Sequence, residues 1–250
     1  MRSLFALAAL VGGCVTTETV QFQPSSTQQA MIRDGVPAIV SRQRNSIVLM
    51  RPARREFQAG ARPVFVVGIN NLGAAPVDFR VANVEVAQLV DGQAAPLKVV
   101  TYEQLVSEEH DRQVFRAVLV GVAAAGNAAS AANAGYYHSN STVITPRGGV
   151  YNVNTTGYNP TAASIAQNRA AAQNEAMVSA TIERGQANLA ALESSVIKDN
   201  TLMPGEWYGG QLHIQPLVSQ GAASTKTYQI TINVGPERHE FRIVQGAPAS

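Results

Sequence analysis

The stretch Thr225-Lys-Thr-Tyr-Gln-Ile-Thr-Ile-Asn-Val234 decides the fold class of this chain, because its apolar and polar residues alternate with a period of two. In an extended strand, Tyr228, Ile230 and Ile232 would lie on one face, together with Val234. Turn residues follow at positions 235–238, and residues 239–244 form a second β-like run. We therefore expect a β-hairpin with one buried face.

The same pattern recurs earlier in the chain and again just before this hairpin. The runs that predict strands are residues 47–50, 62–69, 77–81, 84–89, 97–100 and 206–214. Turn residues separate them, for example Asn70-Asn71 and Asp91-Gly92. A bulge is expected at Gly209-Gly210. Short strands at this spacing favour an antiparallel sandwich.

Two long helices are predicted where the β pattern stops, over residues 101–199. Thr101 with Gln104 reads as a capping box, and Asn159-Pro160 reads as an N-cap followed by proline. The most apolar positions of the second helix fall on one stripe: Ile165, Val178, Ile182, Leu189, Leu192 and Val196. Alanine and glycine on the inner faces, with Gly121, Gly126 and Gly185 as points of close approach, would let the helices pair.

The resulting prediction is an α+β fold. One β-sandwich is split between residues 36–100 and 200–246, because neither part alone has enough strands for a core. The insertion at residues 101–199 is an antiparallel helical hairpin, with a tip at residues 136–158. We expect this tip to lie about 50 Å from the helix bases, given about 1.5 Å per helical residue.

Residues 64–86, the segment Pro204-Gly-Glu-Trp-Tyr-Gly-Gly210 and residues 228–244 together resemble the immunoglobulin-like modules of uncharacterised bacterial lipoproteins. In those proteins an alanine-rich helical hairpin interrupts the sandwich. The resemblance implies architecture only, because that group has no settled activity. This sequence lacks the paired cysteines around a tryptophan that are usual in antibody domains.

The first residues of the sequence have the order of a secretory signal: Arg2, a short apolar run, and small residues. Val11-Gly12-Gly13-Cys14 looks like the lipobox of bacterial lipoproteins. That resemblance implies cleavage between Gly13 and Cys14, a diacylglycerol on the cysteine sulfur and an acyl chain, such as palmitate, on the new amine. The alternative is an ordinary signal peptide or a buried strand. Residues 14–35 are expected to be a tether, although residues 19–22 could add to a sheet as an edge strand.

The location predicted from these features is the cell envelope. Because Val15 rather than aspartate follows Cys14, the sequence resembles lipoproteins destined for the outer membrane, on its periplasmic or its outer side. Removing residues 1–13 takes Arg2 from the 19 basic residues and leaves 18 against 17 acidic ones. This balance gives no electrostatic reason to expect nucleic acid as a partner. The expected partners are the membrane, through the anchor, and an envelope protein or further copies of this chain.

A recognition tip is predicted from the tyrosines Tyr136, Tyr137, Tyr151 and Tyr158, together with Arg147. They lie among Asn, Ser, Thr and Gly, and this composition is typical of recognition loops. Residues 142–145 and 150–153 could pair as a small hairpin. A polar connector without a binding role is the alternative.

No catalytic or metal-binding pattern stands out, so we expect a protein that is not an enzyme and binds no cofactor besides its lipid. Glu109-His110-Asp111 is expected to be a solvated helix surface. Trp207 and Tyr208 are expected at the core and rim of the sandwich.

The apolar run at residues 117–126 is too short to span a bilayer. Charges in the second helix, such as Arg169 and Glu175, argue against insertion of the helices into lipid. The sequence therefore predicts a lipid-anchored envelope protein with a structural, scaffolding or recognition role. The alternative is an oligomeric, membrane-active component or an accessory component of transport or secretion, in which the hairpins pack together.

Overall fold

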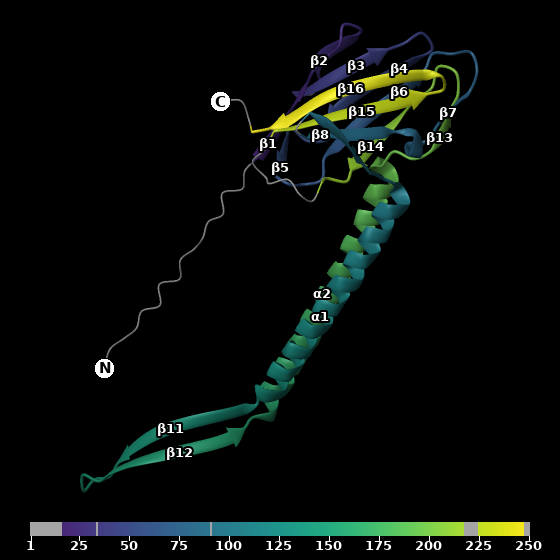
Figure 1. Ribbon diagram of the computed structural model, residues 1–250. Coiled ribbons are helices and arrows are strands. Elements are labelled where there is room, and N and C mark those ends of the chain that lie inside the picture. The colour runs from purple at the N-terminus through teal and green to yellow at the C-terminus, as the bar shows by residue number, and fades with distance from the viewer. Residues whose placement is uncertain (1–16, 34, 91, 218–224, 248–250) are drawn as a thin grey trace. The chain divides into compact units, whose positions relative to one another are not determined.

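The chain forms two compact units in the computed structural model, which describes residues 17–33, 35–90, 92–217 and 225–247 (Figure 1). One unit, here called the sandwich, comprises residues 1–104 and 195–250. The other, here called the insertion, comprises residues 105–194. Gly13 and Cys14, the predicted cleavage and lipidation sites, lie outside the described residues. The predicted α+β class, with two antiparallel sheets and an inserted helical pair, is confirmed.

The sandwich contains two six-stranded antiparallel sheets. The first has the order β5-β1-β16-β15-β8-β9, and its strands are β5 (Glu56–Gln58), β1 (Thr17–Phe22), β16 (Glu237–Gly246), β15 (Lys226–Val234), β8 (Glu85–Val90) and β9 (Gln93–Leu97). The second has the order β10-β14-β6-β4-β3-β2, and its strands are β10 (Val99–Val100), β14 (Trp207–Ile214), β6 (Val64–Asn71), β4 (Ser46–Pro52), β3 (Val36–Arg42) and β2 (Gln28–Arg33). A short pair, β7 (Val77–Phe79) with β13 (Asn200–Leu202), and the 3₁₀ turn η1 (Val81–Asn83) complete the unit.

The inward faces of the two sheets form one hydrophobic core. Tyr228, Ile230 and Ile232 of β15 are at most 1% exposed, as the alternation predicted. They belong to the same cluster as Phe65 of β6 and Phe241 of β16. Because both sheets contribute to this cluster, the sandwich buries most of its large apolar side chains between its own strands.

The tether prediction is wrong from Thr17 onward. Residues of β1 pair with β16 on one side, from Thr19 opposite Gly246 to Phe22 opposite Ile243, and with β5 on the other. β1 is thus an interior strand, and β2 is the edge strand of the second sheet. Their Thr- and Gln-rich sequences are weakly periodic; β2 pairs with its neighbour β3, whereas one partner of β1 is β16, more than two hundred residues away.

The bulge prediction at Gly209-Gly210 is also wrong, because β14 pairs with β6 without interruption from Trp207 to His213. These glycines serve close packing. A Cβ atom on Gly209 would lie 2.3 Å from the carbonyl oxygen of Val67, and one on Gly210 would lie 2.7 Å from the amide nitrogen of Ile197. Both obstacles are backbone atoms, so neither site can accept a side chain without movement of the main chain.

The helices α1 (Tyr102–Asn133) and α2 (Pro160–Ser195) begin as predicted. The Gln104 amide donates to Thr101 Oγ1 at 3.4 Å, and the Thr101 amide donates to Gln104 Oε1 at 3.3 Å, which completes a capping box. At α2, the amides of Thr161 and Ala162 donate to Asn159 Oδ1 at 3.0 and 3.1 Å. These local contacts define where each helix starts.

A β-hairpin connects the two helices: β11 (Tyr136–Ile144) pairs with β12 (Val150–Tyr158) over nine residue pairs. The Asn159 amide donates to the Gly135 carbonyl at 2.7 Å and joins the hairpin to the helices. A Cβ atom on Gly135 would meet the Tyr158 ring at 2.4 Å, so the junction is filled tightly. The hairpin is longer than the short one that the sequence predicted.

Candidate functional site: the outward faces of the insertion

The seam between α1 and α2 is made of small and polar residues. Its buried positions include Ala131 on α1 and Ala163, Ala170 and Gly185 on α2. Asn127 donates to the side chain of Asn174 at 2.9 Å, and Asn174 donates to the carbonyl of Ala124 at 3.2 Å. The predicted inner faces of alanine and glycine are therefore confirmed, with asparagines added between them.

Glycine marks close approach at only one of the three predicted helical positions. A Cβ atom on Gly185 would lie 2.9 Å from the side chain of Gln113, whose amide donates to the Gly185 carbonyl at 3.2 Å. Gly121 and Gly126 have nothing within 4 Å of that position, so the prediction is wrong there.

Glu109 is 2% exposed in this seam, so the prediction of a solvated Glu109-His110-Asp111 surface is wrong for this residue. Asn188 donates to Glu109 Oε1 at 2.9 Å, and Arg112 lies 3.1 Å from Oε2. Burial raises the pKa of the Glu109 carboxyl, but the hydrogen bonds from Asn188 and Gln113 and the nearby arginines outweigh it and lower that pKa overall. Glu109 is thus held ionised between the helices.

Bulky apolar side chains of the insertion point to solvent instead. On α1 the exposed ones are Val114, Phe115, Val118, Leu119 and Val122, at 52–68% exposure. These five residues are here called the apolar stripe; their spacing of one, three and four residues places them on one side of the helix. On α2, Ile165, Val178 and Ile182 of the predicted amphipathic stripe are 45–54% exposed as well.

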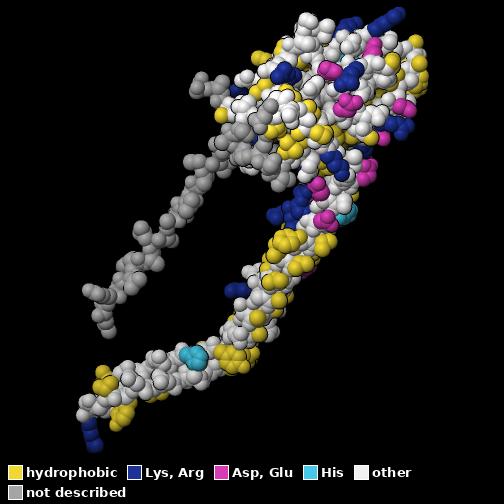
Figure 2. Space-filling model, viewed as in Figure 1, with side chains coloured by type: hydrophobic (Ala, Val, Ile, Leu, Met, Phe, Trp, Pro, Cys, Tyr) yellow, Lys and Arg dark blue, Asp and Glu magenta, His cyan; other side chains and the backbone are white. Residues whose placement is uncertain are grey.

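Figure 2 shows hydrophobic side chains gathered along the part of the helices nearer the β-hairpin, and charged ones towards the other end. By length and composition, α1 is also apolar enough to cross a membrane, and only 6% of its most apolar window is buried. The arrangement is the reverse of an ordinary helical hairpin, whose apolar side chains face the partner helix.

The β-hairpin has two faces of different chemistry. In this register, residues with even numbers share one face and residues with odd numbers share the other. The even face, here called the amide face, carries His138, Asn140, Thr142, Asn152, Asn154 and Thr156 between its terminal residues. The odd face, here called the hydroxyl-aromatic face, carries Tyr137, Ser139, Ser141, Val143, Tyr151, Val153, Thr155 and Gly157.

The five predicted recognition residues do not form one cluster. Tyr136 and Tyr158 pair at the helix end of the hairpin, with ring centroids 5.0 Å apart, and Tyr137 lies over Gly157 beside them. Tyr151 lies towards the turn at residues 145–149, which contains Arg147. Tyr151 lies opposite Val143, seven residues from Tyr136, which puts about 23 Å between these two groups.

One cluster of serine, histidine and glutamate side chains lies inside the sandwich, around His239. His239 is fully buried, with Nδ1 2.9 Å from Ser41 Oγ and Nε2 2.8 Å from Ser46 Oγ, and Ser46 also donates to Glu237. Burial lowers the pKa of His239 despite the charge of Glu237, which raises it. The carboxylate contacts the serine rather than the histidine, and both serines are at most 4% exposed. This network lacks the order and the accessibility of a hydrolytic triad.

A second buried polar cluster in the first sheet is an ion pair joined by a glutamine. Lys226 Nζ lies 2.8 Å from Glu18 Oε1, with both side chains at most 8% exposed, and Gln245 donates to Glu18 Oε2 at 2.6 Å. The three residues come from adjacent strands β15, β1 and β16. They form a hydrogen-bonded ion pair inside the sandwich, and Lys226 also lines a small pocket of about 200 Å³.

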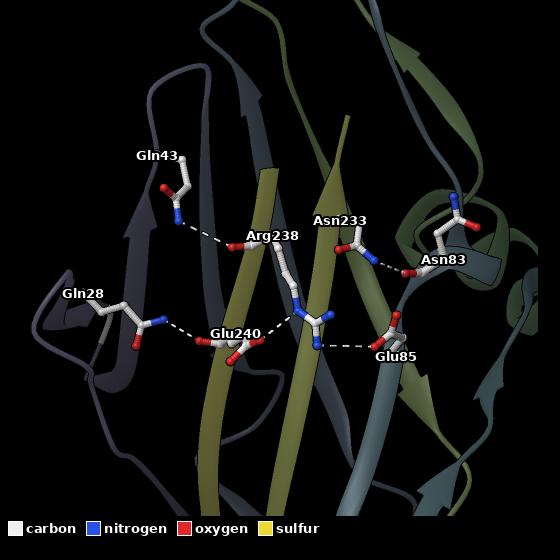
Figure 3. Close-up of polar contacts among 7 residues, drawn as sticks. All are labelled: Gln28, Gln43, Asn83, Glu85, Asn233, Arg238 and Glu240. Atoms are coloured by element: carbon white, nitrogen blue, oxygen red, sulfur yellow. Dashed lines mark hydrogen bonds and ion pairs between the residues drawn. The ribbon is translucent and has the colours of Figure 1, made fainter. Parts of the chain in front are cut away.

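A shallow polar groove of about 590 Å³ lies beside β16 and is lined mainly by Gln, Ser and Thr. Figure 3 shows Gln28 and Gln43 pointing to the β16 backbone, and Arg238 between Glu240 and Glu85. Arg238 Nε lies 2.7 Å from Glu240 and Nη2 lies 3.6 Å from Glu85, with all three side chains more than half exposed. Exposed pairs of this kind contribute little energy.

Trp207 is 58% exposed and covers Gly68, so it is not a core residue. Tyr208 is half-buried, and its hydroxyl contacts the backbone of Lys198 at 2.9 and 3.1 Å. Within residues 17–33, 35–90, 92–217 and 225–247, no three His, Cys, Asp or Glu residues are grouped to hold a metal ion. The feature without a partner inside its own unit is therefore the outward surface of the insertion.

Comparison with known proteins found no match: no protein-family model, no curated protein and no solved structure matches the chain. The lipoprotein and immunoglobulin-like resemblances accordingly stay predictions.

Proposed function

We propose that this chain is a lipid-anchored structural protein of the bacterial cell envelope that assembles with further copies of itself through the insertion. The observation that carries this proposal is the apolar stripe of α1. Contiguous exposed apolar surface on a protein is a mark of an interaction site. Here it coexists with a seam that is already closed by alanine, glycine and asparagine, so the stripe is not needed to hold the two helices together.

A second copy is the occupant that fits the insertion best. The insertion carries exposed apolar residues on both helices, with Val118 and Val122 on α1 and Val178 and Ile182 on α2. The α1 surface of one copy can therefore meet the α2 surface of the next, an arrangement that closes into a ring when the rotation allows it. No Lys, Arg, Asp or Glu lies within residues 117–133 of α1, whereas Glu175, Glu183 and Arg184 flank Val178 and Ile182 on α2.

The anchor is proposed from Val11-Gly12-Gly13-Cys14, with the immunoglobulin-like resemblance as secondary support. The fold is compatible with attachment close to a membrane surface, because only Val15 and Thr16 separate Cys14 from β1. Replacing Cys14 with serine should release the protein from the membrane fraction. Continued membrane binding of that variant without lipid would contradict the anchor.

Assembly is tested by the mass of the full-length protein extracted from membranes in mild detergent. A Val118→Glu and Val122→Glu double variant should fall to a monomer, because each glutamate would have to be buried against a neighbour. Gln58→Glu with Gln93→Glu, at exposed positions of the sandwich, adds the same charge and should leave the mass unchanged. A monomeric natural protein would overturn the proposal.

Recognition of another envelope protein is the second candidate, and the β-hairpin favours it. Its exposed tyrosines and asparagines are the side chains that recognition surfaces use. Deleting residues 136–158 should then abolish capture of the partner in a crosslinking pull-down and leave the β content of the sandwich intact. Unchanged capture would assign the hairpin a connecting role only.

A further inference from the structure

We infer that the β11–β12 hairpins of several copies join edge to edge into a closed β-barrel that crosses a lipid bilayer. This inference deepens the proposed self-assembly and rests on it. It assigns the hairpin two kinds of contact: backbone pairing with the hairpins of neighbouring copies, and lipid against one of its faces.

The edges of the hairpin supply the first argument. Within the described part of the chain, β11 and β12 pair only with each other, so each leaves one backbone edge over nine residues without a strand partner. Soluble proteins normally protect such edges with lysine, proline or a bulge. Neither strand contains a proline or any Lys, Arg, Asp or Glu, and the pairing runs without a bulge.

Repetition of the hairpin satisfies both edges at once. The free edge of β12 in one copy can pair with the free edge of β11 in the next, because neighbouring strands then alternate in direction. Closing the ring removes every edge. The smallest membrane barrels have about eight strands, which corresponds to about four copies at two strands each.

The two faces of the hairpin supply the second argument. A membrane barrel needs one face that lipid tolerates and one that faces a polar interior. The hydroxyl-aromatic face has no charge, no amide and no histidine, whereas the amide face carries His138 and three asparagines. Tyr137 lies near one end of the hydroxyl-aromatic face and Tyr151 near the other, while the amide face ends in the pairs Tyr136–Tyr158 and Ile144–Val150. These are the two levels at which membrane barrels place aromatic residues.

Strand length and charge supply the third argument. Membrane-crossing strands have about nine to eleven residues, and β11 and β12 have nine each. Arg147 lies in the turn, outside both strands, where it would remain in water on the far side of the bilayer. The apolar stripe of α1 belongs to the same unit and provides helix contacts between the same neighbours.

The inference is tested by cysteine substitution in the full-length, lipid-modified protein. The one natural cysteine is Cys14, whose sulfur is blocked in that form, so each added thiol is the only reactive one. The variants are Ser139→Cys and Ser141→Cys on one face, and Asn140→Cys and Thr142→Cys on the other. Each is reconstituted into phosphatidylethanolamine–phosphatidylglycerol vesicles and treated with a water-soluble maleimide.

The expected result is labelling with a period of two. Thiols at positions 140 and 142 should react from a water-filled interior, and thiols at 139 and 141 should lose their labelling when vesicles are present. Equal labelling at all four positions would overturn the barrel. A matched charge pair gives a second readout: Ser141→Asp should abolish conductance across a planar bilayer of the same lipids, whereas Asn140→Asp should keep it.

The possible failures are distinguishable. A stable oligomer in detergent whose four thiols label equally would overturn the barrel and leave the proposed assembly intact. A monomer would overturn both. A Val122→Cys thiol on α1 reports on the helices. If this thiol lost its labelling in vesicles while all four hairpin thiols labelled equally, the helices rather than the strands would enter the lipid, and the barrel would be overturned.

Discussion

The sandwich and the insertion bury opposite kinds of side chain. In the sandwich, Tyr228, Phe65 and Phe241 are at most 1% exposed. In the insertion, Phe115 is 63% exposed, whereas Glu109 and Ala131 are buried. Because hydrophobic stabilisation follows the apolar area removed from water, the sandwich is complete by itself and the insertion is not. The difference teaches that the sandwich buries its apolar side chains within itself, whereas the insertion leaves those of α1 exposed to solvent.

The largest expected effect comes from truncating one aromatic side chain in each unit. Phe241→Ala should lower the free energy of unfolding of the sandwich by about 4 kcal/mol, because it leaves a cavity in the core. Phe115→Ala, the matched change on the apolar stripe, should alter that free energy by less than about 0.5 kcal/mol. Urea denaturation followed by far-ultraviolet circular dichroism measures both. Equal losses would show that the apolar stripe is part of a folded core.

The next effect concerns the ion pair inside the sandwich. Lys226→Met should cost about 3 kcal/mol in urea denaturation, because it leaves the Glu18 carboxylate buried without a cation. Adding Glu18→Leu should recover most of that loss. The exposed Arg238–Glu85 pair provides the control, since Glu85→Gln should cost less than about 1 kcal/mol. A similar cost at both sites would contradict the contrast in burial.

A smaller, pH-dependent effect is expected from His239. Its pKa is lowered in the fold by burial, so the unfolded chain binds the proton more tightly. The stability of the sandwich should therefore be constant well above the ordinary pKa of about 6.5 and fall below it, by at most about 1.4 kcal/mol per pH unit. His239→Gln should flatten this slope between pH 7 and pH 5. An unchanged slope in that variant would assign the acid sensitivity to other groups.

The smallest effect concerns Glu109 in the helix seam. Its pKa is lowered in the fold, so its contribution is present above the ordinary pKa of about 4.5 and is lost as the pH falls below that value. Amide hydrogen exchange in α1 and α2 should speed up near Glu109 at pH 4 relative to pH 7. Glu109→Gln should remove most of this pH dependence. Uniform protection at both pH values in the natural protein would contradict the assignment.

The features predicted correctly from the sequence were those whose cause is local. The alternation around Ile230 and Ile232 identified β15, and Thr101 and Asn159 identified the helix starts, because strand period and capping involve residues a few positions apart. The strand β1 was anticipated only as a possible edge strand over residues 19–22, because its pairing with β16 joins segments at opposite ends of the chain. No window of sequence contains that information.

The outward surface of the insertion was only partly predictable. Alanine and glycine indicated the close seam, but the stripe of α1 could equally have faced inward. Glu109 was assigned to the surface because adjacent helix positions face different directions, and its partner Asn188 lies 79 positions away. The two faces of the hairpin became visible only when the register fixed which residues are opposite one another.

The interior position of β1 would have a mechanical consequence under the proposed lipid anchor. A force applied at Cys14 would reach β1 through Val15 and Thr16. β1 is hydrogen-bonded to β5 on one side and to β16 on the other. The load would spread at once over two ladders and the Glu18–Lys226 pair, instead of peeling away a loose outer strand. Under the proposed anchor, this connection would resist a force that pulls the sandwich away from the membrane.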